Sequence, residues 1–156
     1  MANGDIPTAL LSYDAATGMV VWLVNKGIAK AGQVASSVNA LGYGRVKING
    51  KSVLAHRLAW ALHYGEWPDG AIDHINGIKT DNRLCNLRLA TRAQNQQNRS
   101  SSTSHKGVTL APDGKWLARC ASNGKRHHIG RFESMDEALL AYRQVARQLH
   151  GSFFKE

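Results

Sequence analysis

The chain has 156 residues, 43% of them hydrophobic, with 20 Lys or Arg against 11 Asp or Glu and hence a net charge of +9. This composition excludes wholesale disorder, predicts one folded domain or two small ones, and favours a polyanionic partner such as nucleic acid, with an ordinary basic surface as the alternative. Two distant cysteines exclude a disulfide scaffold and a multi-cysteine zinc site, and the longest apolar run, Met19–Val24, is far shorter than the ~20 residues that cross a bilayer.

The first third of the chain predicts short paired strands and then one helix. Leu10–Tyr13 and Met19–Val24 are expected to pair as strands. A second hairpin is expected around Asn49-Gly50, because Asn-Gly suits the positive φ angles of a tight turn. Over Leu54–Gly65 the leucines recur every four residues, which is typical of one apolar helix face.

A β-loop-β-α unit follows this helix. Ala71–His74 and Leu87–Ala90 are predicted strands, with a polar loop between them. Thr91-x-x-Gln94 has the form of a capping box, so a helix is expected to begin at Thr91. The polar, serine-rich residues 96–106 are expected to form an exposed linker.

The last third predicts three strands and one helix. The strands are expected at Gly107–Ala111, Lys115–Ser122 and Lys125–Phe132, joined by an Asp-Gly and an Asn-Gly turn. A second capping box, Ser134-x-x-Glu137, opens an amphipathic helix that ends at Gly151, with Leu149 among its inward residues.

The β-loop-β-α unit carries the residues suited to chemistry. Asp73 and His74 are adjacent at a strand end, where their side chains diverge, as a metal ligand and a general base require. Asn86 lies twelve residues after His74, and Asn95 lies nine residues further on, in the first turns of the expected helix. Taken alone, the Asp-His pair is more often a hydrogen-bonded turn pair, and each asparagine an ordinary turn or helix-surface residue.

Several spaced motifs together resemble a known family, the HNH endonucleases, and most closely the phage and intron-encoded HNH homing endonucleases. The HNH motif itself is matched by Ile72-Asp73-His74-Ile75-Asn76-Gly77, Asp81-Asn82-Arg83, Asn86-Leu87-Arg88 and Thr91…Asn95. The homing subgroup is also matched by Tyr13-Asp14-x-x-Thr17-Gly18, His56-Arg57-Leu58-Ala59-Trp60 and Gly65-Glu66-Trp67-Pro68.

The resemblance implies a role for each candidate. His74 would be the general base that takes a proton from water, Asp73 and Asn95 would bind one divalent cation, and Asn86 would hold the loop and so orient His74. Asn95 stands where the family often has histidine, and oxygen ligands alone favour Mg²⁺ or Mn²⁺, with Zn²⁺ less suited. His56, His63 and His150 are expected to pack or to lie at helix ends, away from this site.

The strands of the last third predict one free, basic sheet face. Alternation places Ala118 and Cys120 toward the helix and Arg119 on the opposite side of the sheet. That opposite side is expected to hold Lys106, Arg119, Arg126 and His128, with Lys115 near its edge. Such a sheet can lie in a DNA major groove, and a solvated face opposite a core is the alternative.

This last third is similar to the plant ethylene-response-factor DNA-binding domain. The matching residues are Lys106-Gly107-Val108, Trp116-x-Ala118-Arg119, Ile129-Gly130-Arg131-Phe132 and Glu137-Ala138…Ala141-Tyr142…Ala146…His150-Gly151. The resemblance implies that the sheet binds the major groove. Thr109 and His128 stand where the plant pattern has arginine and tryptophan, which implies different base recognition.

The expected fold class is α+β, with N-terminal β-hairpins and a helix leading into a ββα-metal (HNH) unit at about 70–99, then a small three-stranded antiparallel sheet packed on one helix. The expected domains are a nuclease domain at 1–98, a linker at 99–105 and a DNA-binding domain at 106–156. The expected function is divalent-metal-dependent cleavage of double-stranded DNA by a cytoplasmic monomer with no membrane or protein partner, in the host-cell cytoplasm if the gene belongs to a phage. The alternatives are a catalytically inactive DNA-binding regulator and an RNA-binding protein.

Overall fold

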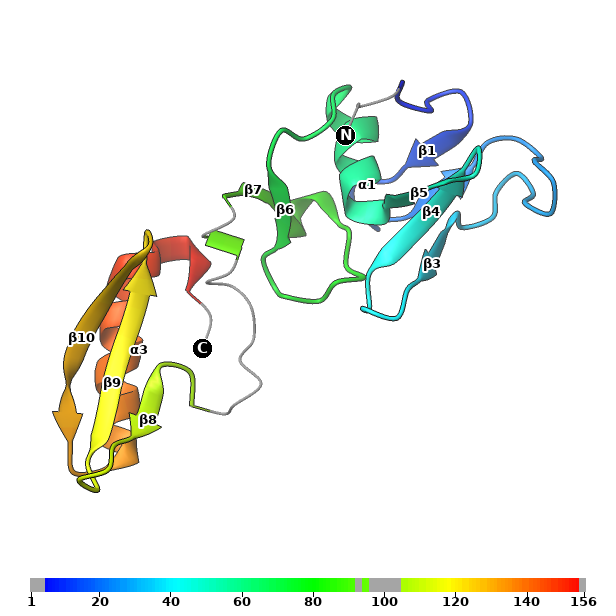
Figure 1. Cartoon of the computed structure of the whole chain (residues 1–156). Coiled ribbons are helices and arrows are strands. Elements are labelled where there is room, and N and C mark those ends of the chain that lie inside the picture. The colour runs from blue at the N-terminus through cyan, green and yellow to red at the C-terminus, as the bar shows by residue number, and fades with distance from the viewer. Residues whose placement is uncertain (1–4, 92–93, 96–104, 155–156) are drawn as a thin grey trace. The chain divides into compact units, whose positions relative to one another are not determined.

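The chain divides into two compact units, Met1–Ala90 and Thr91–Glu156, each of which is described here by itself. The computed structural model (Figure 1) describes residues 5–91, 94–95 and 105–154. Residues 99–104 of the expected linker lie outside the described residues, so the domain limits expected from the sequence stay a prediction.

The first unit begins with two small antiparallel sheets. Its strands are β1 (Leu11–Tyr13), β2 (Val20–Trp22), β3 (Ser36–Val38), β4 (Gly44–Ile48) and β5 (Lys51–Leu54), paired as β1-β2 and β3-β4-β5. Asn49 and Gly50 join β4 to β5 with φ angles of 49° and 80°, the left-handed conformation that a tight hairpin turn needs. Both predicted hairpins are therefore confirmed.

Helix α1 (Ala55–Tyr64) follows β5 directly and ends at Gly65, which adopts the left-handed C-cap conformation. The guanidinium of Arg57 donates to the carbonyl oxygens of Pro68 and Gly70 at 2.9 and 2.8 Å. These bonds tie the first turn of α1 to the segment that enters the next strand.

Strands β6 (Ala71–His74) and β7 (Leu87–Ala90) form an antiparallel pair, joined by a loop that ends in a short 3-10 turn, η1 (Leu84–Asn86). Both strands have the limits expected from the sequence. Leu87 and Ile72 pack into one apolar core with residues of α1 and of the N-terminal strands. This core holds the end of β6 against the helix.

The second unit is a three-stranded antiparallel sheet covered by one helix. Its elements are β8 (Val108–Leu110), β9 (Trp116–Ser122), β10 (Lys125–Phe132), α3 (Met135–His150) and η2 (Gly151–Phe153), with β9 in the centre of the sheet. Figure 1 shows α3 lying along one face of this sheet. The Ser134 hydroxyl accepts from the Glu137 amide at 3.2 Å, which is the expected N-terminal cap of α3.

The inward face of α3 differs from the expectation at its last turn. Leu149, expected to face inward, is exposed, whereas His150 is buried. Ala138, Tyr142 and Ala146 fill the interface with the sheet. Their spacing of four residues continues to His150 and leaves Leu149 facing solvent, so the prediction for Leu149 was wrong.

Candidate functional site

His74, the last residue of β6, lies buried at 5% exposure. Its Nε2 atom is 3.1 Å from the side-chain oxygen of Asn82. Because that oxygen only accepts hydrogen bonds, Nε2 must carry the proton, and a neutral His74 then has its basic lone pair on Nδ1. Asn82 therefore sets which nitrogen of His74 can take a proton.

Two further rings pack against His74. The ring centroid of His56 lies 5.0 Å from that of His74, with the planes nearly perpendicular, and the ring of Tyr43 lies 6.3 Å away. Tyr43 and His56 also contact each other, at 5.7 Å. The expectation that His56 packs away from the site was wrong, because the first turn of α1 is buried against the end of β6.

His56 is uncharged at neutral pH. Burial, together with the nearby positive charges of His74 and Arg57, lowers the pKa of His56 to about 3. The neutral imidazole of His56, at 4% exposure, therefore adds no charge to the buried cluster around His74.

Asp73 precedes His74 on β6 and is buried at 5% exposure. It lies opposite Arg88 in the β6–β7 pair, and the Nε and Nη2 atoms of Arg88 are both 2.8 Å from its Oδ2 atom. Sequence reasoning missed this ion pair, because a long polar loop between two strands does not fix which residues stand opposite each other. The pair ties the Asp73 carboxylate on β6 to the Arg88 guanidinium on β7.

Asn86 bridges the loop between β6 and β7. Its side-chain oxygen accepts from the Asn76 amide at 2.9 Å, and its side-chain nitrogen donates to the Asp81 carbonyl at 2.7 Å. Its own carbonyl accepts from the Ile75 amide at 2.9 Å. Asn86 thus shapes the loop directly after His74, while Asn82 contacts the His74 ring itself.

The β1–β2 hairpin also contacts Asn82, at its backbone. The Tyr13 hydroxyl donates to the Asn82 carbonyl at 2.8 Å, and burial raises the pKa of Tyr13 to about 12, with the Asp14 charge adding to the shift. Gly18 lies so close that a Cβ atom there would stand 2.5 Å from the Arg83 amide nitrogen. A chain of contacts therefore runs from Tyr13 through Asn82 to His74.

Replacing Tyr13 by Phe is expected to lower the free energy of unfolding by ~1–2 kcal/mol, because the Asn82 carbonyl loses its donor in a partly buried position. A chemical denaturation curve measures the change. Ser12→Ala, at the neighbouring position of β1, serves as the control and is expected to change stability by less than ~0.5 kcal/mol. A Tyr13→Phe protein as stable as the parent would contradict the anchoring role.

Asn95 belongs to the second unit, on the helix that begins near Thr91. The Thr91 amide donates to the Gln94 side chain at 2.8 Å, and the Gln94 amide donates to the Thr91 hydroxyl at 3.2 Å, which confirms the predicted capping box. Only Gln94 and Asn95 of this helix are described, so the complete ββα arrangement and the pairing of Asn95 with Asp73 stay predictions. Within the described residues, no cluster of three or more His, Cys, Asp or Glu could hold a metal ion.

The sheet of the second unit has the expected polar face. Arg119 on β9 stands opposite His128 on β10, and Arg126 stands opposite Ala121, with all four side chains exposed. Thr109 on β8 is exposed on the same face. Buried Ala118 and Cys120 face α3, as alternation predicts.

Two cations at the edge of this face are paired with acids. Lys115 contacts Glu133 at 2.6 Å, and Arg131 contacts Asp113 at 2.5 Å. A β-bulge between His128 and Gly130 shifts the register by one residue, which brings Arg131 onto the same side as Arg119. These exposed ion pairs are weak. Lys115 and Arg131 can therefore leave their carboxylate partners and bind another anion.

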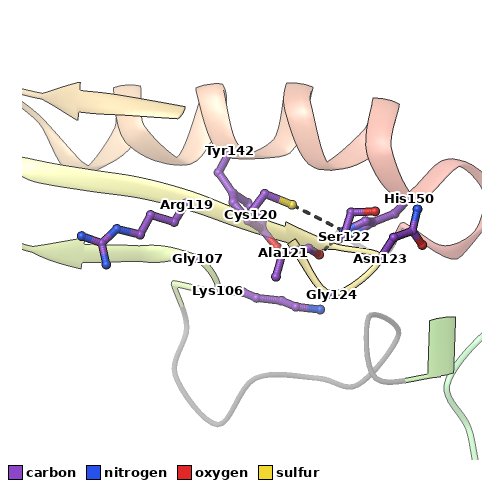
Figure 2. Close-up of a pocket in the computed structure, with 10 residues that line it drawn as sticks. All are labelled: Lys106, Gly107, Arg119, Cys120, Ala121, Ser122, Asn123, Gly124, Tyr142 and His150. Atoms are coloured by element: carbon purple, nitrogen blue, oxygen red, sulfur yellow. Dashed lines mark hydrogen bonds between the residues drawn. The ribbon is translucent and has the colours of Figure 1, made fainter. Parts of the chain in front are cut away.

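A pocket of about 410 Å³ lies where β8 begins, beside the end of β9, and Lys106, Arg119, Cys120, Tyr142 and His150 are among its lining residues. Figure 2 shows the side chains of Lys106 and Arg119 extending in opposite directions, so the two cations do not converge on one anion. Cys120 Sγ lies 3.4 Å from His150 Nε2, and burial raises the pKa of the Cys120 thiol. The thiol therefore stays protonated at neutral pH and is a poor nucleophile.

Comparison with known proteins places the chain among viral relatives. The model of the HNH endonuclease family matches residues 53–97, a segment that contains His56, Asp73, His74, Asn82, Asn86 and Asn95. A protein of Acanthamoeba polyphaga mimivirus named uncharacterized HNH endonuclease L560 is 36% identical over 100 residues, which cover 63% of this chain and 54% of that protein. This chain thus spans about half the length of the mimivirus relative.

Two further similarities were found. Protein 3.8 of Escherichia phage T7 is 30% identical over 109 residues, which cover 66% of this chain and 89% of the phage protein. A solved structure described as "DNA binding and cleavage by the HNH homing endonuclease I-HmuI" aligns with 82% of this chain and 78% of its own, at 23% identity and a TM-score of 0.45.

No helix within the described parts of the chain is both long enough and apolar enough to span a bilayer. The match of the family model to the segment around His74, with relatives aligned over most of this chain, confirms the family expected from the sequence. The chain belongs to the HNH endonuclease family.

Proposed function

We propose that the chain is a divalent-metal-dependent DNA endonuclease of the phage HNH homing type, in which His74 is the general base and the sheet of the second unit binds the DNA major groove. The observation that carries the proposal is the buried His74 ring beside Asp73, with its protonation set by Asn82. A base needs a lone pair held in one direction, and the bond from Nε2 to Asn82 supports Nδ1 as that base.

In the proposed reaction, Nδ1 of His74 takes a proton from the attacking water, and the resulting hydroxide attacks the scissile phosphorus. Nε2 keeps its proton throughout and donates it in a hydrogen bond to the Asn82 side-chain oxygen. The same hydrogen bond stabilises the imidazolium that forms. The P–O3′ bond breaks, and the departing 3′ oxygen takes a proton from solvent water, which gives a 5′-phosphate and a 3′-hydroxyl end. Asn86 keeps the loop after His74 in place during the reaction.

The donor set proposed for the metal consists of the Asp73 carboxylate and the Asn95 side-chain oxygen. Arg88 contacts Oδ2 of Asp73 through its Nε and Nη2 atoms, and carboxylate and amide oxygens are hard ligands that suit Mg²⁺ or Mn²⁺ better than Zn²⁺. When bound, the cation would stabilise negative charge on the scissile phosphate and the departing oxygen. Arg88 orients the Asp73 carboxylate at the end of β6.

The second unit is proposed to bind DNA as an ethylene-response-factor-type sheet. Arg119, Arg126 and His128 lie on one exposed face opposite the helix, and Thr109 lies on the same face. Arginines on such a face can bond guanine edges or phosphates in the major groove. Lys106 and Lys115, at the margins of the sheet, are proposed to contact phosphates.

Replacing both Arg119 and Arg126 by Ala is expected to weaken binding to duplex DNA ~10-fold or more and to reduce the slope of log affinity against log salt by ~2. Fluorescence anisotropy over a range of salt concentrations measures both quantities. Arg143→Ala with Arg147→Ala, on the exposed side of α3, removes the same charge from the other side of the unit and is expected to change affinity less than threefold. Equal losses in the two double variants would show that only net charge matters and would contradict the sheet-face proposal.

Incubation of supercoiled plasmid with the full chain tests the proposed activity. In Mg²⁺ or Mn²⁺ we expect relaxed or linear product, and in chelator only supercoiled DNA. DNA binding without cleavage in either metal would instead identify an inactive DNA-binding protein.

A further inference from the structure

One buried polar atom beside His74 has no hydrogen-bond partner among the described residues. His56 is 4% exposed, and its Nδ1 atom makes no hydrogen bond with any described residue. A buried nitrogen of this kind loses its bonds to water on folding without replacing them, so such atoms are rare and usually mark an ordered water or ion. Nδ1 of His56 thus has hydrogen-bonding capacity inside the fold that the described side chains do not use.

The surroundings of His56 determine which partner its Nδ1 atom can bind. The neighbouring rings are Tyr43 and His74, at 5.7 and 5.0 Å, and the nearest charged side chain on its own helix, Arg57, is committed to the carbonyl oxygens of Pro68 and Gly70. With its pKa lowered to about 3, His56 is neutral and can accept or donate one hydrogen bond at each nitrogen. A neutral imidazole among rings suits a water molecule, which can both donate and accept, better than it suits an anion or a metal cation.

We infer that His56 is a positioning residue of the nuclease reaction, whose Nδ1 atom binds a buried water molecule beside His74 while its ring packs against the His74 ring. The inference rests on the proposed function, since it assigns His56 a part in the same site. The water bound to His56 would lie next to the His74 ring. It would hold the His74 ring and the attacking water in a constant orientation relative to each other. His56 itself touches neither DNA nor the cation in this assignment.

Two substitutions separate this role from simple packing. His56→Phe keeps a ring of similar size but removes Nδ1, and it also removes the cost of the unpartnered atom, so its melting temperature is expected to equal or exceed that of the parent. His56→Asn loses the ring and is expected to melt lower, but its side chain can place a polar atom near the position of Nδ1. If the bound water matters, the less stable His56→Asn protein cleaves faster than the more stable His56→Phe protein.

The expected loss for His56→Phe is a ~10- to 100-fold lower single-turnover cleavage rate with unchanged affinity for DNA, as is typical when a partner that orients a reacting group is removed. His63→Phe, on an exposed position of the same helix, is the matched control and is expected to cleave at the parent rate. A His56→Phe protein that cleaves at the parent rate, or two His56 variants whose rates follow their melting temperatures, would overturn the inference.

A measurement that does not depend on cleavage completes the test. In nitrogen-15-labelled parent protein, we expect a cross-relaxation signal between the His56 ring protons and a slowly exchanging water, and no such signal at position 56 in His56→Phe. Absence of this signal in the parent overturns the water site, whereas a parent that does not cleave plasmid overturns the proposed function. The two failures are therefore distinguishable.

Discussion

His74→Gln is expected to lower the single-turnover rate of DNA cleavage in Mg²⁺ by ~10²- to 10⁴-fold, the range over which a general base acts. Glutamine can keep the hydrogen bond to the Asn82 side-chain oxygen, because its amide nitrogen reaches the position of Nε2. It has no basic nitrogen at the position of Nδ1. The variant therefore removes the proposed base while it preserves the contact that orients the side chain.

The control for this experiment is His63→Gln, the same substitution at an exposed histidine of α1. We expect it to cleave at the parent rate, and we expect both variants to bind duplex DNA as the parent does, since neither position lies in the sheet of the second unit. Cleavage by His74→Gln within threefold of the parent rate would mean that another group takes the proton.

Asp73→Asn is expected to have the second large effect, a loss of ~10²-fold or more in the cleavage rate at saturating Mg²⁺. A neutral amide binds a divalent cation far less strongly than a carboxylate, and a cation at a phosphoryl centre contributes several kcal/mol, with each 1.36 kcal/mol worth about tenfold. The substitution also removes the ion pair between Asp73 and Arg88, whose side chain is 16% exposed, so the free energy of unfolding is expected to fall by up to ~3–5 kcal/mol.

Separating these two effects of Asp73→Asn requires that cleavage be measured below the melting temperature of the variant. Asp69→Asn, an exposed acid just before β6, is the matched control and is expected to change neither rate nor stability. A destabilised but folded Asp73→Asn protein that cleaves at the parent rate would assign Asp73 to the ion pair with Arg88 alone and would overturn its role as a metal ligand.

Local signals in the sequence were sufficient for the elements that frame the site. The limits of β6 and β7 follow from short apolar runs bounded by turn residues, and the cap at Thr91 follows from a polar residue three positions before glutamine. Both signals act between residues close in sequence, where the backbone hydrogen bonds of a strand or helix end are satisfied locally. For the same reason the Asn49-Gly50 hairpin could be predicted.

The contacts that complete the His74 environment could not be predicted in this way. Asn82 lies in a polar loop, where a solvated asparagine is the ordinary expectation. His56 lies on a helix that is rich in alanine and leucine. Their meeting with His74 depends on how α1 and the loop pack in three dimensions, which periodicity along one element does not encode. The sequence did indicate that Asn82 and His56 both lie within motifs of the family, but the motifs did not assign a role to either residue.

The basic face of the second unit could likewise be predicted only in part from the sequence. Alternation along β9 was enough to place Arg119 outward and Cys120 inward. Alternation alone would place Arg131 on the helix side, and the one-residue register shift after His128 reverses that. A bulge is a property of the paired strands together, so the sequence of β10 by itself did not indicate it.

The proposed hydrolysis of DNA with a divalent cation leaves ends of defined chemistry. The most direct measurement is single-turnover cleavage of supercoiled plasmid by the parent chain in Mg²⁺ and in chelator, followed by treatment of the product with DNA ligase without prior phosphorylation. We expect product in Mg²⁺ only, and we expect the ligase to reseal it because each nick carries a 5′-phosphate and a 3′-hydroxyl. Equal cleavage in chelator, or nicks that the ligase cannot seal, would contradict the proposed hydrolysis.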